Sequence, residues 1–262
     1  MKAGLITLLT DFGTADYFVG AVKGAILSVN PEALIVDITH EIPPQDVETG
    51  AFTLMAAYRT FPAGTIHVAV VDPGVGSSRR PIIVSANDQL FVGPDNGLFT
   101  YIYERELSHQ AFHVTAEKYF RPKVSTTFHG RDIFAPVAGA LSNGVKPNKL
   151  GSVIDDAVRL NYSRQPQIIH IDHFGNCVTN ISREDFEGTI ASLKINGKTI
   201  RNFREFYGED SSGGLFAIWG SAGFLEIAVN GGSAAKRLRA KRGDEVFLTQ
   251  RRKGAKKGAN EN

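Results

Sequence analysis

The first 140 residues of this chain alternate short apolar runs with segments of helical spacing, and this pattern limits the fold most. Apolar runs typical of strands lie at residues 5–9, 34–38 and 65–71. Between the first two, residues 16–30 place apolar side chains on one helical face and end before Pro31. Repeated strand–helix–strand units with apolar strands are typical of a largely parallel sheet covered by helices. We therefore predict an N-terminal α/β domain.

Further elements extend this domain. Asp46 is a favourable N-cap for a helix that we expect to run to Tyr58. Residues 81–86 and 89–92 predict a strand pair, and residues 131–141 predict another helix.

The pattern changes near residue 155, beyond which short β-like runs follow one another. The pair Asn196-Gly197 between two such runs is a strong signal for a two-residue hairpin. We predict a smaller, all-β, barrel-like C-terminal domain. The expected organisation is an α/β domain over 1–155, a linker over 156–165, the β domain over 166–250 and a disordered basic tail over 251–262.

Composition and charge limit the functional classes. The start of the chain reads as a first strand rather than a signal peptide, and no apolar run is long enough to span a bilayer. A single cysteine, Cys177, fits a reducing compartment, so we expect a soluble cytoplasmic protein. The net charge is +2, yet ten Lys or Arg and only three Asp or Glu follow from Lys236 onward. We interpret this Gly-rich basic end as a solvated tail rather than a nucleic-acid or membrane site.

Polar side chains follow three of the predicted parallel strands. Asp11, Thr39, His40 and Asp72 each come directly after an apolar run. Ligands of open parallel sheets bind beyond the carboxyl ends of the strands. The sequence therefore predicts a site at this edge of the sheet.

Six short segments, taken in order, carry a family resemblance that covers almost the whole chain. They are TDFG at 10–13, DPGVG at 72–76, PDNG at 94–97, FHGRD at 128–132, FGN at 174–176 and GSAGFLEIA at 220–228. In this order they resemble the S-adenosyl-L-methionine (SAM) hydroxide adenosyltransferases, which are relatives of the fluorinase and chlorinase.

The resemblance implies a fold, an assembly and a reaction. It implies an N-terminal α/β domain and a C-terminal β-barrel in a homotrimer, with each active site between neighbouring subunits. The implied reaction is substitution at the ribose C5′ of SAM with loss of methionine. Water would be the nucleophile, the products would be adenosine and L-methionine, and neither a metal nor another cofactor would be needed.

The resemblance also implies a catalytic group of Asp72, Arg79 and His129. Arg79 would orient Asp72, and either Asp72 or His129 would take the proton of water. Arg80 is the alternative to Arg79. A carboxylate at position 72 would repel a halide, which favours water as the nucleophile over chloride or fluoride.

Substrate contacts are implied in both domains. Asp11 matches the carboxylate that accepts the ribose hydroxyls, and Asp172 matches the partner of the methionine ammonium. Phe174 and Asn176 match adenine contacts, and Ser221 matches a contact of the methionine carboxylate. The remaining predicted substrate-binding residues are Asp16, Asn96, Gly97 and Glu226.

Three positions depart from the halogenase pattern. Gln45 stands where the fluorinase has a Trp, Phe18 where it has a Ser near the halide, and Ala222 where it has an Arg beside the methionine carboxylate. These differences weigh against halogenation.

Four other interpretations stay open at this point. They are a chlorinase-like halogenase, a non-catalytic SAM or adenosine binder, a nucleic-acid-associated protein acting through its tail, and a metal site at His170, Asp172 and His173. No HExxH motif or paired cysteine accompanies the last cluster, so we expect no metal there.

Overall fold

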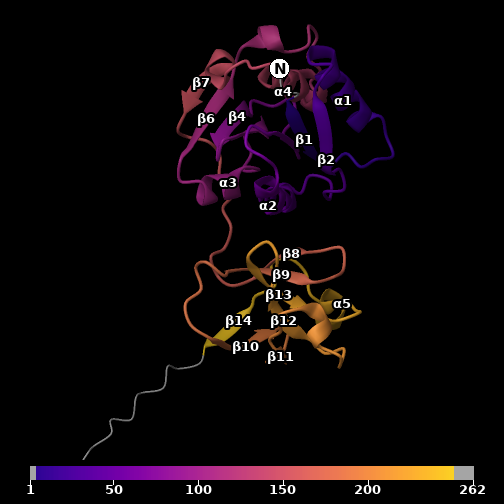
Figure 1. Ribbon diagram of the computed structural model, residues 1–262, viewed down its shortest axis with the longest axis vertical. Coiled ribbons are helices and arrows are strands. Elements are labelled where there is room, and N and C mark those ends of the chain that lie inside the picture. Colours follow the sequence, from indigo (N-terminus) through magenta and orange to yellow (C-terminus); the bar gives the residue numbers. More distant parts are fainter. Residues whose placement is uncertain (1–3, 251–262) are drawn as a thin grey trace, which may run out of the picture. The chain divides into compact units, whose positions relative to one another are not determined.

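The computed structural model describes residues 4–250, which form two compact units that divide between Asn161 and Tyr162 (Figure 1). This division lies inside the segment predicted as a linker, 156–165. The predicted basic tail, 251–262, lies outside the described residues.

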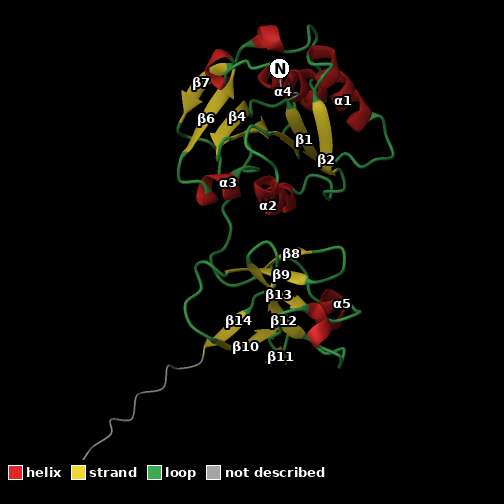
Figure 2. Cartoon of the chain, viewed as in Figure 1, coloured by secondary structure: helices red, strands yellow, loops and turns green. Residues whose placement is uncertain are grey.

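The first unit is built on a seven-stranded sheet of order β2-β1-β3-β5-β4-β6-β7. Figure 2 shows the strands of this unit in yellow and its helices in red. The pairs β1–β2, β1–β3 and β3–β5 are parallel, and the remaining pairs are antiparallel. The predicted parallel sheet is therefore confirmed in the middle and replaced by antiparallel pairs toward one edge. The strands are β1 Leu5–Thr10, β2 Leu34–Thr39, β3 Ile66–Val70, β4 Pro81–Ala86, β5 Gln89–Pro94, β6 His109–Val114 and β7 Gly151–Ile154.

Helices cover both faces of this sheet. The helices are α1 Phe18–Val29, α2 Val47–Ala57, α3 Thr100–Arg105 and α4 Ala135–Ser142. Apolar side chains of α1 and α4 share one buried cluster with β1, β3 and β5. Those of α2 and α3 share a second cluster with the opposite side of the strands. The alternating apolar runs thus form a three-layer α/β unit.

The predicted helix over 131–141 is two elements. A π-helical turn, Gly130–Phe134, precedes α4. Pro136 lacks the N–H that would bond to the carbonyl of Asp132 in a continuous helix, and that carbonyl accepts the backbone N–H of Arg121 at 2.9 Å instead. This hydrogen bond ties the start of the helix to Arg121, in the segment that precedes His129.

The second unit contains a four-stranded sheet of order β12-β13-β9-β8 and a three-stranded sheet of order β11-β10-β14. The predicted hairpin is confirmed, because Asn196 and Gly197 both take positive φ between β10 and β11. Isolated bridges join Gln167 to Glu245 and Phe203 to Ala217. The elements are β8 Ile168–Ile171, β9 Cys177–Ser182, β10 Ile190–Ile195, β11 Lys198–Ile200, β12 Phe216–Trp219, β13 Phe224–Ala228, α5 Ala234–Leu238 and β14 Phe247–Gln250.

Within residues 4–250, none of the helices has the length and apolar character that a membrane span requires.

Candidate active site

The turn that follows β3 brings Asp72 and Arg79 together. The Nε of Arg79 donates to Asp72 Oδ1 at 2.9 Å, and one terminal amino group donates to Asp72 Oδ2, so the pair is bidentate. Both side chains are largely buried, at 9% and 5% exposure. The guanidinium also packs over the ring of Phe134, with 5.2 Å between Cζ and the ring centroid. The predicted pairing of these two residues is therefore present.

Close backbone packing brings His129 to this pair. Gly76, at φ +80°, lies against the backbone of Thr126, and a Cβ there would be 2.1 Å from the Thr126 carbonyl oxygen. The segment before His129 is fixed by the fully buried Asp132, which accepts the backbone N–H of Ser125 at 2.8 Å. Only glycine at position 76 permits this approach.

His129 completes a three-residue network. Its Nδ1 lies 2.7 Å from the same amino group of Arg79 that binds Asp72. Burial lowers the pKa of His129, and the Arg79 cation lowers it further. Both effects favour the neutral imidazole.

A pocket of about 380 Å³ opens beside Asp72 and His129. Asp11 also lines it and accepts the backbone N–H of Gln45 at 2.7 Å. Burial raises the pKa of Asp11, and the neighbouring Asp72 raises it too. The other lining residues are Phe12, Phe18, Pro44, Gln45, Val70, Pro73, Val75, Thr127, Phe128 and Gly130. The sheet edge predicted from the sequence thus holds a pocket, which Asp11 and Asp72 line but Thr39 and His40 do not. Two positions that depart from the fluorinase, Phe18 and Gln45, also line it.

Three predicted pocket residues lie elsewhere. Asp16 is exposed and outside the lining. Asn96 donates to the Val71 carbonyl at 2.8 Å, and Gly97 packs against Leu160, so both belong to a turn that supports the residue before Asp72. The predicted roles of these three residues as substrate contacts stay predictions.

The choice between Arg79 and Arg80 is decided by their partners. Arg80 points to Asp95, with its Nε 2.8 Å from Asp95 Oδ2, and to Asp156. Arg79 alone joins Asp72 and His129.

The second unit has a pocket of its own, of about 660 Å³. It gathers all five residues predicted for that domain: Asp172, Phe174, Asn176, Ser221 and Glu226. Sequence reasoning missed the remaining lining residues, Tyr207, Val229, Asn230, Gly231 and Gly232.

Two carboxylates face this second pocket. Asp172 accepts the backbone N–H of Asn176 at 2.8 Å and its side-chain amide at 2.9 Å, so the amide predicted to contact adenine already has one partner. Glu226 accepts the hydroxyl of Tyr207 at 3.0 Å. Burial raises the pKa of Glu226, and Asp172 raises it as well. A cationic ligand would relieve this concentration of negative charge.

In the part of the chain that the structure describes, no three His, Cys, Asp or Glu side chains are grouped so that they would hold a metal ion. His170, Asp172 and His173 do not form such a group.

Comparisons with known proteins agree with this arrangement. The SAM hydroxide adenosyltransferase N-terminal domain matches residues 6–151, and the C-terminal domain of the same family matches residues 166–247. The chain is 39% identical to an (R)-S-adenosyl-L-methionine hydrolase of Methanocaldococcus jannaschii, over 93% of this chain and 95% of the relative. It is 35% identical to the protein of that name from Thermus thermophilus, over 93% and 98%.

A more distant relative and a solved structure also match nearly the whole chain. A fluorinase of Nocardia brasiliensis is 27% identical over 92% of this chain and 95% of the relative. The crystal structure of an uncharacterized conserved protein from Thermotoga maritima superposes with a TM-score of 0.86 at 36% identity, over 93% of this chain and all of that one. The two domain matches and the relatives that span nearly the whole chain place this protein in the SAM hydroxide adenosyltransferase family.

Proposed function

We propose that this protein hydrolyses SAM to adenosine and L-methionine. The observation that carries the proposal is the Asp72–Arg79–His129 network beside a pocket that also holds Asp11. Four relatives at 35–39% identity support it, because each is named as a SAM hydrolase.

The substrate we propose is the (R) form at sulfur. The sulfonium of SAM carries three different carbon groups and a lone pair, so it is a stereocentre. The four relatives are named for the (R) form. This is narrower than the expectation from the sequence, which did not distinguish the two epimers.

The leaving group needs little assistance from the protein. Methionine departs as a neutral thioether, so no acid is needed on that side. Water is a weak nucleophile, and it must be held in line with the C5′–S bond while a nearby group accepts its proton. The balanced reaction converts the SAM cation and water into adenosine, methionine and one proton.

Asp72 is the proton acceptor in this proposal, and His129 is a donor that orients the water. A guanidinium only donates hydrogen bonds, so Nδ1 of His129 must accept from Arg79. The neutral ring then carries its proton on Nε2 and has no free lone pair with which to act as a base. Each Asp72 oxygen keeps a lone pair after its bond from Arg79.

The two pockets would divide the substrate between them. Asp11 would accept the ribose hydroxyls in the first pocket. In the second, Asp172 and Glu226 would bind the methionine ammonium, Ser221 its carboxylate, and Phe174 would stack on adenine. No metal or other cofactor takes part in this proposal.

We also propose the assembly that the resemblance implies, a homotrimer in which the first unit of one subunit and the second unit of its neighbour form each site. The placement of the predicted substrate contacts in two separate units supports it.

We also propose that the second unit closes into the barrel-like shape predicted from the sequence. The isolated bridges Gln167–Glu245 and Phe203–Ala217 support this closure.

The test uses separated (R) and (S) epimers of SAM with the full chain in chelator-treated buffer, with and without chloride. We expect adenosine and methionine from the (R) epimer at a rate that chloride leaves unchanged, and a kcat lower by about 100-fold or more for Asp72→Asn. Formation of 5′-chloro-5′-deoxyadenosine would show a halogenase instead. Tight SAM binding without turnover of either epimer would show a non-catalytic binder.

A further inference from the structure

Two threonine–histidine pairs lie along β1. Thr7 Oγ1 is 2.7 Å from Nδ1 of His67, and Thr10 Oγ1 is 2.8 Å from Nδ1 of His40. All four side chains are buried. The first pair joins β1 to the neighbouring strand β3 inside the sheet. The second pair stands at the end of β1, directly before Asp11, so only this pair adjoins a residue that lines the pocket.

His40 holds the chain on both sides of Asp11. Its carbonyl accepts the backbone N–H of Gly13 at 2.8 Å. Its ring binds the hydroxyl of Thr10, and the same hydroxyl oxygen accepts the backbone N–H of Phe12 at 3.3 Å. The residues before and after Asp11 are therefore fixed through one histidine.

The other ring nitrogen of His40 lies beside a charged pair. Nε2 is 3.2 Å from Asp37 Oδ1, and Lys23 donates to Asp37 Oδ2 at 2.6 Å. A carboxylate only accepts hydrogen bonds, so this neighbour favours the tautomer with its proton on Nε2. Nδ1 then accepts the hydroxyl proton of Thr10, and the hydroxyl oxygen keeps its lone pairs for the N–H of Phe12.

A turn supplies the direct contact with Asp11. The backbone N–H of Asp46 donates to the carbonyl of Pro43 at 3.0 Å. Pro44 and Gln45 lie between them, and Gln45 takes φ +66°. The third position of a type II turn has this left-handed conformation, which residues other than glycine rarely adopt and which is found at functional sites. It directs the Gln45 N–H to Asp11 Oδ2 at 2.7 Å.

We propose that His40 is a positioning residue that acts through Thr10 to orient the Asp11 carboxylate for a ribose diol. This inference rests on the proposed function, in which Asp11 accepts the two ribose hydroxyls. A carboxylate binds two adjacent hydroxyls best when it is already held in the required orientation. Neither Thr10 nor His40 lines the pocket, so their loss should weaken diol binding without removing a contact to the ligand.

The first test compares two nucleosides by isothermal titration calorimetry with the full chain. They are adenosine and 2′,3′-dideoxyadenosine, which lacks both ribose hydroxyls. Thr10→Val removes the hydroxyl and keeps the shape, so it should weaken adenosine binding about tenfold and leave the binding of dideoxyadenosine unchanged. Thr10→Ser should restore most of the affinity. Thr7→Val is the matched control, because it removes the equivalent hydroxyl on the same strand and should change neither affinity.

The second test separates the two nitrogens of His40. His40→Asn places its amide near the position of Nδ1 and can still bind Thr10, whereas His40→Gln places its amide near Nε2 and loses that bond. Adenosine affinity should fall about tenfold in His40→Gln and by less than about threefold in His40→Asn. His40→Gln and Thr10→Val should also raise KM for (R)-SAM about tenfold while kcat changes by less than about threefold.

A third measurement needs no ligand. The backbone N–H of Gln45 binds Asp11, so its hydrogen exchange reports whether the carboxylate stays in place. Exchange at Gln45 should be about tenfold faster in Thr10→Val and in His40→Gln, and unchanged in Thr7→Val. Since Thr10→Val is isosteric, it keeps the test open if a substitution of His40 prevents folding.

Three results would overturn the proposal. One is an equal loss of affinity for both nucleosides, which would mean that the pocket has loosened as a whole. Another is an effect of Thr7→Val as large as that of Thr10→Val. The last is unchanged adenosine binding and unchanged exchange at Gln45 in Thr10→Val and His40→Gln. If the wild type binds the two nucleosides equally, the proposed diol contact of Asp11 fails instead, and exchange at Gln45 still decides whether His40 positions the carboxylate.

Discussion

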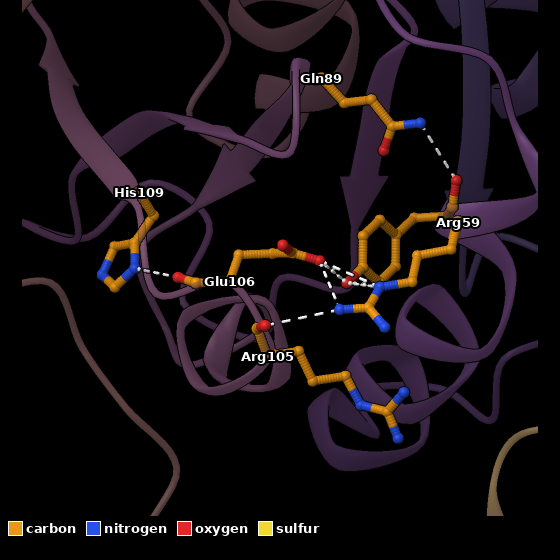
Figure 3. A network of polar contacts seen from close by, with 6 residues as sticks. Arg59, Gln89, Arg105, Glu106 and His109 are labelled. Carbon is orange, nitrogen blue, oxygen red and sulfur yellow. Dashed lines mark hydrogen bonds and ion pairs between the residues drawn. The ribbon is translucent and has the colours of Figure 1, made fainter.

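Two arginine–carboxylate networks lie at opposite ends of the same sheet, and their difference shows what makes one of them a candidate site. Where β3 ends, Arg79 and Asp72 are both largely buried beside a pocket. Near the start of β5, Arg59 binds Glu106 at 2.9 Å (Figure 3). The buried Tyr58 donates its hydroxyl to the same carboxylate. This second network joins the end of α2 to the end of α3. Arg59 remains 46% exposed there.

The two networks use the same chemistry in different roles. Gln89 donates to the carbonyls of Tyr58 and Phe61 at 3.2 and 2.9 Å, which ties the second network to β5. The first network instead leaves carboxylate lone pairs and Asp11 facing open space. An ion pair alone therefore does not indicate a site, whereas a buried pair beside a cavity with a second carboxylate is a candidate site.

The largest effect should come from Asp72→Asn. An amide cannot accept the proton of water, so kcat should fall by about 100-fold or more. The rate of adenosine formation measures this, with circular dichroism as the check that the variant folds. Retention of a tenth of the activity would exclude Asp72 as the proton acceptor.

Acid should lower the free energy of unfolding through the buried His67. Burial lowers the pKa of His67 to about 4, while its Nδ1 lies 2.7 Å from Thr7 Oγ1. The folded pKa is below the unfolded value of about 6.5, so the contribution to stability is complete above that pH and is lost as the pH falls toward 4. Urea unfolding at pH 7 and 5 should differ by about 2 kcal/mol from this residue.

The control for the acid effect is His67→Gln, which removes the titration. Its free energy of unfolding should depend less on pH over the same interval. An equal pH dependence in both proteins would assign the effect to other groups.

Glu106→Gln should separate stability from activity. It removes the charge that binds Arg59 and Tyr58, so the free energy of unfolding should fall by about 1.5 kcal/mol. The kcat of the folded enzyme should not change. A matching loss of kcat would contradict the division between the two networks.

The smallest effect should come from His129→Gln. Glutamine offers an acceptor toward Arg79 and a donor toward water, so kcat should fall only about tenfold, whereas His129→Ala should lose more. Equal losses in the two variants would favour His129 as the base.

Much of the first unit followed from the sequence, since long apolar runs and caps are local signals. Asp46 caps α2 as expected, accepting the backbone N–H of Thr49 at 3.0 Å. The strands β6 and β7 and the six-residue helix α3 were missed, because none of them is long enough to show a clear period. The π turn before α4 needed the contact from Arg121, which no local pattern encodes.

The site residues divide in the same way, into those that local motifs predicted and those that only tertiary contacts reveal. The motif residues were placed in two pockets, yet Tyr207 lies in a short 3₁₀ turn without any sequence signal. Asn96 and Gly97 were predicted as substrate contacts from a family motif, and the structure adds that they contact Val71 and Leu160, which no local pattern indicated. Tertiary contacts decide such positions.

The most direct test of the central claim is a single turnover of (R)-SAM in ¹⁸O-labelled water, with mass analysis of the products. If water held by the Asp72–Arg79–His129 network attacks C5′, adenosine carries one labelled oxygen and methionine carries none. Unlabelled adenosine, or cleavage that gives any other nucleoside product, would contradict the account.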